Sequence, residues 1–336
     1  MDDSAWRQLQ DLLDLATPWA LRVAATLRIP DLIASGVTDL AALAERSAAD
    51  VATLERVLRL LVARGVLAEP EPGEFSLTAI GRLLENGAGF RAWLDQDGFG
   101  GRMDRAWPAL LDSVRAGLPC YADLFGAPFW EDLAAHPEIA ASYNTLMAAQ
   151  SASIGPALAE CFDWSGVREV VDVGGGSGTL LAALARAHPH LRGTVLEFPS
   201  TARAAAERFA REGLAERCRA VGGSMFDALP KGADVYILCV VIGDWNDARS
   251  AAILARCAEA AGATGRVLIV EAAREADPAG SAAMDLQMLV VSGGRSRTRE
   301  EFRAVIAAAG LELVRSYSIF SGLCVLECAA PLRSLR

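Results

Sequence analysis

The sequence predicts an α/β fold: a doubly wound, Rossmann-like sheet with an antiparallel last strand, preceded by an all-α, winged-helix domain. Three observations support this fold class. A glycine-rich turn joins a buried strand to a helix at residues 168–185, strands and helices alternate from residue 167 onward, and a helix–turn–helix–hairpin pattern precedes them. With 336 residues, 52% of them hydrophobic and 22% charged, the chain can form two or three domains with sizeable cores.

The glycine-rich turn is the centre of this prediction. Residues 168–185 read REVVDVGGGSGTLLAALA, a β-branched run and Asp172 followed by glycines and a helical apolar repeat. Glycine permits positive φ and lets a ligand approach the backbone. The dinucleotide pattern G-x-G-x-x-G, begun at Gly174 and Gly176, would require glycine where Thr179 stands. The next predicted strand ends in Glu197, which can accept hydrogen bonds from two ribose hydroxyls. The glycine-rich turn and Glu197 together favour an adenosyl cofactor.

The composition limits the partners and the compartment. The formal net charge of −10 and the pI near 5.0 argue against a nucleic-acid or anionic-membrane surface. No signal-like segment and no apolar stretch of about 18 residues is present, so we expect a cytoplasmic protein without membrane contact. The seven cysteines form no CxxC pair, which predicts reduced thiols and no metal site.

The N-terminal residues predict a helical domain. Apolar residues recur at helical spacing over residues 5–35, where Pro18 interrupts the pattern and Pro30 is expected to end it. A helix is expected to begin near Asp39, and a second one spans 48–64 before Gly65. Two short strands around a Pro-Gly turn follow, which completes a winged-helix order.

A winged helix suggests two functions, DNA binding or dimerisation. The second predicted helix carries balanced charges and the predicted wing carries Glu69, Glu71 and Glu74, which would repel DNA. The first helices are too apolar to remain uncovered. We therefore expect a scaffold for a homodimer, with no nucleic-acid partner.

Residues 91–162 are predicted to form a helical linker and pocket cap between a domain at 1–90 and a domain at 163–336. This segment is mainly helical and rich in aromatic residues. Tyr143, Asn144 and Met147 share one helical face, and either core packing or pocket lining explains them. A buried amide such as that of Asn144 needs a partner, which could be a substrate oxygen.

The alternating strands place the remaining candidate residues. Ligands of doubly wound sheets bind beyond the carboxyl ends of the strands. Those ends carry residues 174–178, Glu197 with Phe198, Ser224 with Met225 and Phe226, residues 243–247, and Glu271. Two late strands without a helix between them must pair antiparallel.

The order of these motifs resembles the class I S-adenosylmethionine-dependent small-molecule O-methyltransferases of the caffeic-acid type, and most closely the actinobacterial branch that tailors antibiotics such as anthracyclines. The motifs DVGGGSG, LEFP, GGSMF, IGDWND, VLIVE, MDLQMLVVSGG and RT-x-E-E-F span nearly the whole chain. The resemblance implies S-adenosylmethionine as cofactor, with Asp172 near its ammonium, Gly174 and Gly176 at its methionine part, Glu197 at the ribose, and Phe198, Ser224, Met225 and Cys239 among its contacts.

The chain departs from this family at three positions. An acidic residue is usual where Ser224 stands, and many members have lysine where Cys239 stands. Plant-type members have a histidine base in a His-Asp-Trp triplet, which here reads Gly243-Asp244-Trp245. None of the three histidines, His136, His188 and His190, is expected near this site, so Asp244 and Glu271 are the remaining candidate catalytic acids. Asp244 could instead cap the helix that begins near Asn246.

The expected reaction is methyl transfer to a small aromatic or polycyclic natural product, with oxygen as the acceptor and positioning in place of a histidine base. Carbon or nitrogen methylation, or a non-methylating hydroxylase or pericyclase on the same fold, stays open. Methionines adapt to flat ligands. The predicted substrate pocket contains Tyr143, Asn144, Met147, Gly243, Trp245, Met284 and Met288.

Overall fold

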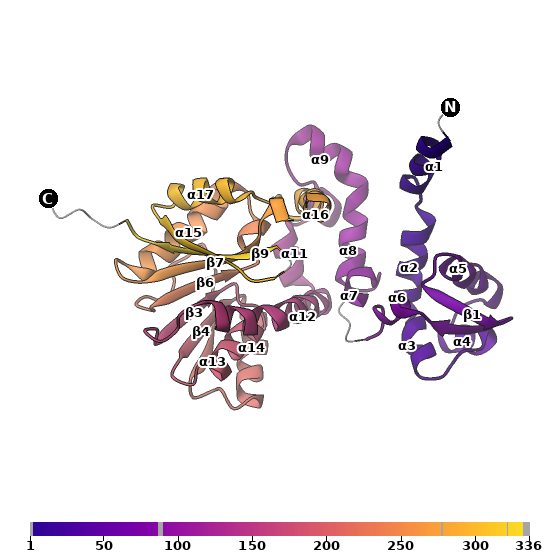
Figure 1. Ribbon diagram of the computed structural model, residues 1–336, viewed down its shortest axis with the longest axis horizontal. Coiled ribbons are helices and arrows are strands. Elements are labelled where there is room, and N and C mark those ends of the chain that lie inside the picture. The colour runs from indigo at the N-terminus through magenta and orange to yellow at the C-terminus, as the bar shows by residue number, and fades with distance from the viewer. Residues whose placement is uncertain (1–2, 87–89, 277, 321, 332–336) are drawn as a thin grey trace. The chain divides into compact units, whose positions relative to one another are not determined.

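The computed structural model describes residues 3–86, 90–276, 278–320 and 322–331. It divides into two compact units, Met1–Arg105 and Ala106–Arg336 (Figure 1). The division at residues 90 and 162 stays a prediction.

The first unit is helical with one hairpin. Its bounds are α1 (Asp3–Leu12), α2 (Ala16–Thr26), α3 (Ile29–Ala34), α4 (Leu40–Arg46), α5 (Val51–Ala63), β1 (Leu67–Glu71), β2 (Glu74–Leu77), α6 (Ala79–Arg82), α7 (Arg91–Leu94) and α8 (Phe99–Ala106). The carboxylates of Asp39 and Asp50 cap α4 and α5 by accepting from the amides of Ala42 and Thr53. The predicted order of helices and hairpin is confirmed.

The sequence predicts that Pro30 ends a helix. In the structure, Pro30 lies instead in the first turn of α3. Proline lacks an amide hydrogen, and the first amides of a helix have no partner within it, so this position suits it. The helix before it ends earlier, at Thr26.

The first two helices present large apolar side chains to solvent. Leu12 at the end of α1 is 78% exposed and Leu15, directly before α2, is 74% exposed, whereas Ala20 and Ala24 of α2 pack into a core with α3, α4 and α5. The further members of this exposed set are Trp6, Leu9, Leu13 and Trp19. A surface of this kind needs a covering partner.

The second unit begins with helices and continues as a sheet. The helices are η1 (Trp107–Ala109), α9 (Leu110–Ala116), α10 (Tyr121–Phe125), α11 (Phe129–Ala135) and α12 (Pro137–Cys161). The glycine at position 155 lets α12 pack closely on α13 (Thr179–Ala187), because a Cβ there would lie 2.6 Å from the Cβ of Ala183. This contact fixes the long helix against the sheet.

The sheet has seven strands in the order β5-β4-β3-β6-β7-β9-β8, and β9 alone among them runs against the others. The strands are β3 (Glu169–Val173), β4 (Arg192–Glu197), β5 (Cys218–Gly222), β6 (Val235–Cys239), β7 (Arg266–Ala272), β8 (Glu312–Ser318) and β9 (Leu323–Ala329). The helices among them are α14 (Pro199–Arg211), η2 (Ile242–Asp244), α15 (Asp247–Ala261), η3 (Arg274–Ala276), α16 (Pro278–Val291) and α17 (Arg299–Ala308). The predicted doubly wound sheet with an antiparallel last strand is confirmed.

Each face of the sheet has its own core. Alternate residues of β6 separate the two: Tyr236 and Leu238 pack with α15 and α17, whereas Val235 and Ile237 pack with α12, α13 and α14 (Figure 1). The chain leaves β3 toward β4 and β5 on one side and reaches β6 and β7 on the other. The crevice beyond the ends of β3 and β6 is therefore the position at which such sheets bind ligands.

None of the described helices is long and apolar enough to cross a membrane. The described residues also include no group of three or more His, Cys, Asp or Glu side chains arranged to hold a metal ion.

Candidate active site

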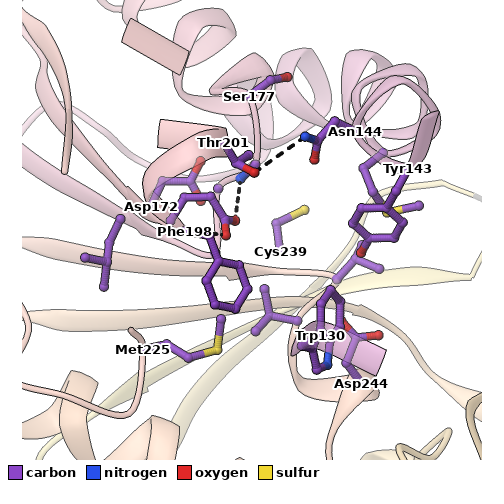
Figure 2. Close-up of a pocket in the computed structure, with 18 of the residues that line it drawn as sticks. Trp130, Tyr143, Asn144, Asp172, Ser177, Phe198, Thr201, Met225, Cys239 and Asp244 are labelled. Atoms are coloured by element: carbon purple, nitrogen blue, oxygen red, sulfur yellow. Dashed lines mark hydrogen bonds between the residues drawn. The ribbon is translucent and has the colours of Figure 1, made fainter. Parts of the chain in front are cut away.

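A cavity lies at the carboxyl ends of β3, β4 and β6 and is closed by α11 and α12. Figure 2 shows Asp172, Phe198 and Met225 on one side and Trp130, Tyr143 and Asp244 on the other. Its described lining includes three carboxyl side chains, those of Asp172, Glu197 and Asp244, and no lysine, arginine or histidine. A cavity with this charge favours a positively charged ligand.

The glycine turn, residues 174–178, forms the floor of one side. Gly174, Gly176 and Gly178 all have positive φ, of 72°, 54° and 75°. A Cβ on Gly174 would lie 3.0 Å from Val241 Cγ2 and 3.2 Å from Met225 Cε. The turn therefore depends on glycine both for its conformation and for the space above it.

Gly175 has a different role, which the sequence does not indicate. Its φ is not in the left-handed region, but a Cβ there would lie 2.4 Å from Oδ2 of Asp172. The backbone of the turn thus closes directly over this carboxyl group. Only glycine allows that approach.

Asp172 is fully buried, and neither carboxyl oxygen has a hydrogen-bond partner within the described residues. Burial, together with the charge of Glu197, raises the pKa of Asp172 to about 7. A buried polar group without a partner is unfavourable unless a ligand supplies one. A cationic group of a bound cofactor would satisfy this carboxylate.

Glu197 is held by two backbone amides. Gly176 N donates to Oε2 at 3.1 Å, and Phe198 N donates to Oε1 at 2.7 Å. Burial raises the pKa of Glu197, and these two hydrogen bonds oppose the shift. The carboxylate is thus oriented, and each of its oxygens keeps a lone pair for a ribose hydroxyl.

The remaining predicted cofactor residues also line this side. Phe198, Ser224, Met225 and Cys239 all border the cavity, and burial raises the pKa of the Cys239 thiol well above its usual value. The Ser224 hydroxyl accepts from Phe226 N at 3.2 Å, which shapes the loop after β5. The glycine turn, the unpartnered Asp172 and the oriented Glu197 fit S-adenosylmethionine, a cation with ribose hydroxyls.

Val240 is an unusual element of the cavity wall, also missed from the sequence. It follows β6 and has a φ of 55°, although a β-branched residue is disfavoured in the left-handed region. Its amide donates to Val270 O at 2.9 Å, which holds the backbone in this conformation. Strain of this kind is found at functional sites.

Aromatic side chains form the opposite wall. Trp130 of α11 stacks on Trp245 with ring centroids 5.9 Å apart and an interplanar angle of 28°. Tyr143 of α12 meets Trp130 edge to face at 5.8 Å. A wall of stacked rings suits a flat aromatic molecule.

Asp244 faces the cavity from this wall (Figure 2). Burial and the charge of Glu271 raise the pKa of Asp244 well above its usual value. The alternative role as a helix cap is wrong, because Asn246 caps α15 by accepting from Arg249 N at 3.0 Å. Asp244 therefore does not cap α15.

Glu271 and Gly243 lie behind this wall and do not line the cavity. Gly243 N donates to Glu271 Oε1 at 3.0 Å, and burial raises the pKa of Glu271 to about 7 despite the nearby Arg297. A Cβ on Gly243 would lie 3.5 Å from Glu271 Oε2, an ordinary contact. A methyl group at position 243 would therefore fit without displacing Glu271.

The predicted substrate residues divide into two groups. Asn144 and Met147 line the cavity with Tyr143, and the Asn144 amide donates to Thr201 Oγ1 of α14 at 3.5 Å (Figure 2). Met284 and Met288 on α16 do not line it, and Met284 is 40% exposed. Their contact with substrate stays a prediction.

The sequence matches two family descriptions. Residues 107–312 match the O-methyltransferase domain, and residues 10–86 match the O-methyltransferase dimerisation domain. The chain belongs to the O-methyltransferase family. The predicted family, enzyme class and S-adenosylmethionine cofactor are therefore confirmed for this methyltransferase.

Two curated relatives of this methyltransferase are named for different reactions. It is 44% identical to the 2,7-dihydroxy-5-methyl-1-naphthoate 7-O-methyltransferase of Streptomyces carzinostaticus, over 93% of this chain and 94% of the relative. It is 42% identical to the aclacinomycin 10-hydroxylase RdmB of Streptomyces purpurascens, over 96% of this chain and 91% of the relative.

Two solved structures resemble the methyltransferase along nearly its whole length. TnmH has a TM-score of 0.92 and 43% identity, with 98% of this chain and 99% of that one covered. NcsB1 in complex with S-adenosylmethionine and 2-hydroxy-5-methyl naphthoic acid has a TM-score of 0.88 and 43% identity, with coverage of 96% and 98%.

Proposed function

We propose that this methyltransferase transfers a methyl group to a hydroxyl of a flat, polycyclic aromatic natural product. The observation that carries the proposal is the two-sided cavity, in which the cofactor residues around Asp172 and Glu197 face the aromatic wall that holds Asp244. A relative named for a naphthoate, and a solved structure with a naphthoic acid, support an aromatic substrate.

The residues that line the cavity have separate roles in binding the cofactor, binding the substrate and accepting the proton. Glu197 and Asp172 orient and neutralise the cofactor, while Trp130, Trp245 and Tyr143 hold the aromatic rings of the substrate. Asp244 accepts a hydrogen bond, and finally the proton, from the reacting hydroxyl. When bound, S-adenosylmethionine supplies a methyl group on a positively charged sulfur, so alignment within about 3 Å is the main requirement.

The raised pKa of Asp244 is consistent with this role. A carboxylate with a raised pKa is a stronger base once ionised, and burial of the site prevents water from competing for it. Glu271, behind Gly243, acts on Asp244 through its charge and on the backbone through its hydrogen bond. We therefore treat Glu271 as a positioning residue.

The reaction is tested by incubating the enzyme with methyl-labelled S-adenosylmethionine and a panel of hydroxylated naphthalenes and anthraquinones. Label in the product together with an equal amount of adenosylhomocysteine supports the proposal. Product formation without adenosylhomocysteine would support a hydroxylase reaction, as the similarity to RdmB suggests.

The variant Gly243→His tests whether Asp244 is sufficient as the base. If it is, an added histidine should not accelerate methylation of weakly acidic phenols, and an acceleration would show that a base is missing. Loss of activity with retained cofactor affinity would show that the reaction needs the space beside Gly243.

We infer that the enzyme acts as a homodimer. The dimerisation domain match and the exposed apolar side chains of α1 and α2 support this assembly. Light scattering at micromolar concentration should give a mass of two chains, and Leu12→Lys should produce monomers. A monomeric wild-type protein would contradict the inference.

A further inference from the structure

Arg297 is the one arginine among the fully buried side chains of the described structure. It precedes Thr298, the N-cap of α17, and its exposed fraction is 0%. It does not line the cavity. A buried guanidinium requires partners for each of its donors, so its contacts indicate what the protein uses it for.

Those contacts converge on the acceptor loop, residues 242–245. Arg297 Nη1 donates to Ile242 O at 2.8 Å, and Nη2 donates to Trp245 O at 2.7 Å. The two carbonyls are the ends of the short turn that carries Gly243 and Asp244. One planar group therefore fixes the distance and orientation between the two ends.

Further bonds fix the guanidinium itself. Arg297 Nε donates to Asp247 Oδ1 at 2.9 Å, and Nη2 donates to the Ser250 hydroxyl at 3.1 Å. The single proton of the Ser250 hydroxyl is shared between the same carbonyls, with Oγ 3.2 Å from Ile242 O and 3.3 Å from Trp245 O. The charge is balanced by Asp247, and the network connects the loop to the first turns of α15.

The backbone beside Arg297 supports the same loop. Arg295 N donates to Gly243 O at 2.9 Å. A Cβ on Gly294 would lie 2.2 Å from Gly243 O, so only glycine permits this approach. The segment 294–297 thus lies directly against the outer side of the acceptor loop.

We propose that Arg297 is a positioning residue for the transfer step: it holds the acceptor loop so that Asp244 and Trp245 keep their alignment with the substrate. This inference rests on the proposed methyl transfer. Arg297 acts on the loop and not on the cofactor side, because none of its hydrogen bonds within the described residues reaches the glycine turn or Glu197.

Arg295 provides a matched control. Its side chain is 38% exposed and pairs with the other oxygen of Asp247 at 3.1 Å and with Glu301 at 2.6 Å. It therefore has the same charge and shares one acidic partner, but its side chain does not bond the carbonyls of Ile242 or Trp245.

The experiment compares Arg297→Ala, Arg297→Lys and Arg295→Ala in kcat, acceptor KM and the cofactor Kd measured by calorimetry. Arg297→Ala should lower kcat about 100-fold, as expected for a displacement of about 1 Å, and change the cofactor Kd less than about threefold. Guanidinium at millimolar concentration should restore part of the lost kcat. Arg297→Lys should remain impaired, because an ammonium cannot bond both carbonyls in the plane, while Arg295→Ala should stay within about threefold of wild type in all three quantities.

A second readout does not depend on turnover. Hydrogen exchange of the Asp244 and Trp245 amides, which bond to Val241 O and Ile242 O, should accelerate in Arg297→Lys and not in Arg295→Ala. Equal kcat in the Arg297 and Arg295 variants, a parallel loss of cofactor affinity, or no rescue by guanidinium would overturn the proposal. Absence of methyl transfer by the wild-type enzyme would refute the proposed function, and the exchange measurement would still judge the role of Arg297.

Discussion

The glycine turn and the acceptor loop follow neighbouring strands, β3 and β6, yet different parts of the chain fix them. The turn is shaped by its own glycines and by Glu197, the last residue of the adjacent strand β4. The acceptor loop is held by Glu271 and Arg297, which come later in the sequence. Cofactor binding is thus encoded locally here, whereas acceptor geometry is encoded by distant residues.

The largest expected effect concerns Asp244. Asp244→Asn should lower kcat by about 10² to 10⁴-fold, because the proton acceptor is removed, and leave the cofactor Kd unchanged. In the wild type, kcat should rise with pH through the raised pKa of Asp244, since only the ionised form accepts a proton. Measuring kcat against pH for the wild type, Asp244→Asn and the exposed control Asp227→Asn tests both expectations. If kcat of Asp244→Asn still rises with pH, Asp244 is not the proton acceptor.

The next effect tests the cofactor side alone. Gly175→Ala should weaken cofactor binding by about 10- to 100-fold, or about 1.4–2.8 kcal/mol, because the new methyl group displaces the Asp172 carboxyl that meets the cofactor. Gly166→Ala is the matched control, since a Cβ there meets no atom within 4 Å. Calorimetry with adenosylhomocysteine measures the difference. Equal affinities in the two variants would show that the turn tolerates a side chain.

Asp172 should show opposite effects on stability and binding. Its folded pKa of about 7 exceeds the usual 3.8, so its stabilising contribution is complete below pH 3.8 and is lost as the pH rises through 7. At pH 8, Asp172→Asn should therefore raise the free energy of unfolding of the cofactor-free protein by roughly 4 kcal/mol, and this gain should vanish near pH 3. The same variant should bind the cofactor more weakly. Thermal unfolding across this pH range is the measurement, and an unchanged stability at pH 8 would count against the buried charge.

The smallest effect distinguishes the wall of the cavity from its surroundings. Met147 lines the cavity, whereas Met288 does not. Met147→Ala should raise the acceptor KM several-fold, by about 1 kcal/mol of lost apolar contact, and Met288→Ala should change it less. Steady-state kinetics with one acceptor gives both values. A larger change in Met288→Ala would place α16 at the substrate after all.

The sequence was sufficient for the fold because the relevant signals are short-range. The strands, the glycine turn and the helix start at Asp39 all depend on neighbouring residues. Pro30 was misjudged because proline suits the first turn of a helix as well as its end. Propensity alone does not separate the two positions.

The candidate site was predictable on one side only. Asp172, Glu197 and their neighbours follow the ends of strands, where sheet topology brings them together. Trp130 could not be assigned, because its contact with Trp245 depends on how α11 packs over the sheet. Val240 could not be assigned either, since nothing in its sequence neighbourhood indicates a positive φ in a β-branched residue.

The buried position of Arg297 has a consequence for how this enzyme can diversify. Because the acceptor loop is braced from outside the cavity, the side chains that line the cavity can be exchanged without disturbing that brace. Substrate range and loop geometry then become separate targets for selection. To change the substrate range, a library of variants should therefore vary Trp130, Tyr143 and Met147 and keep residues 294–297 constant.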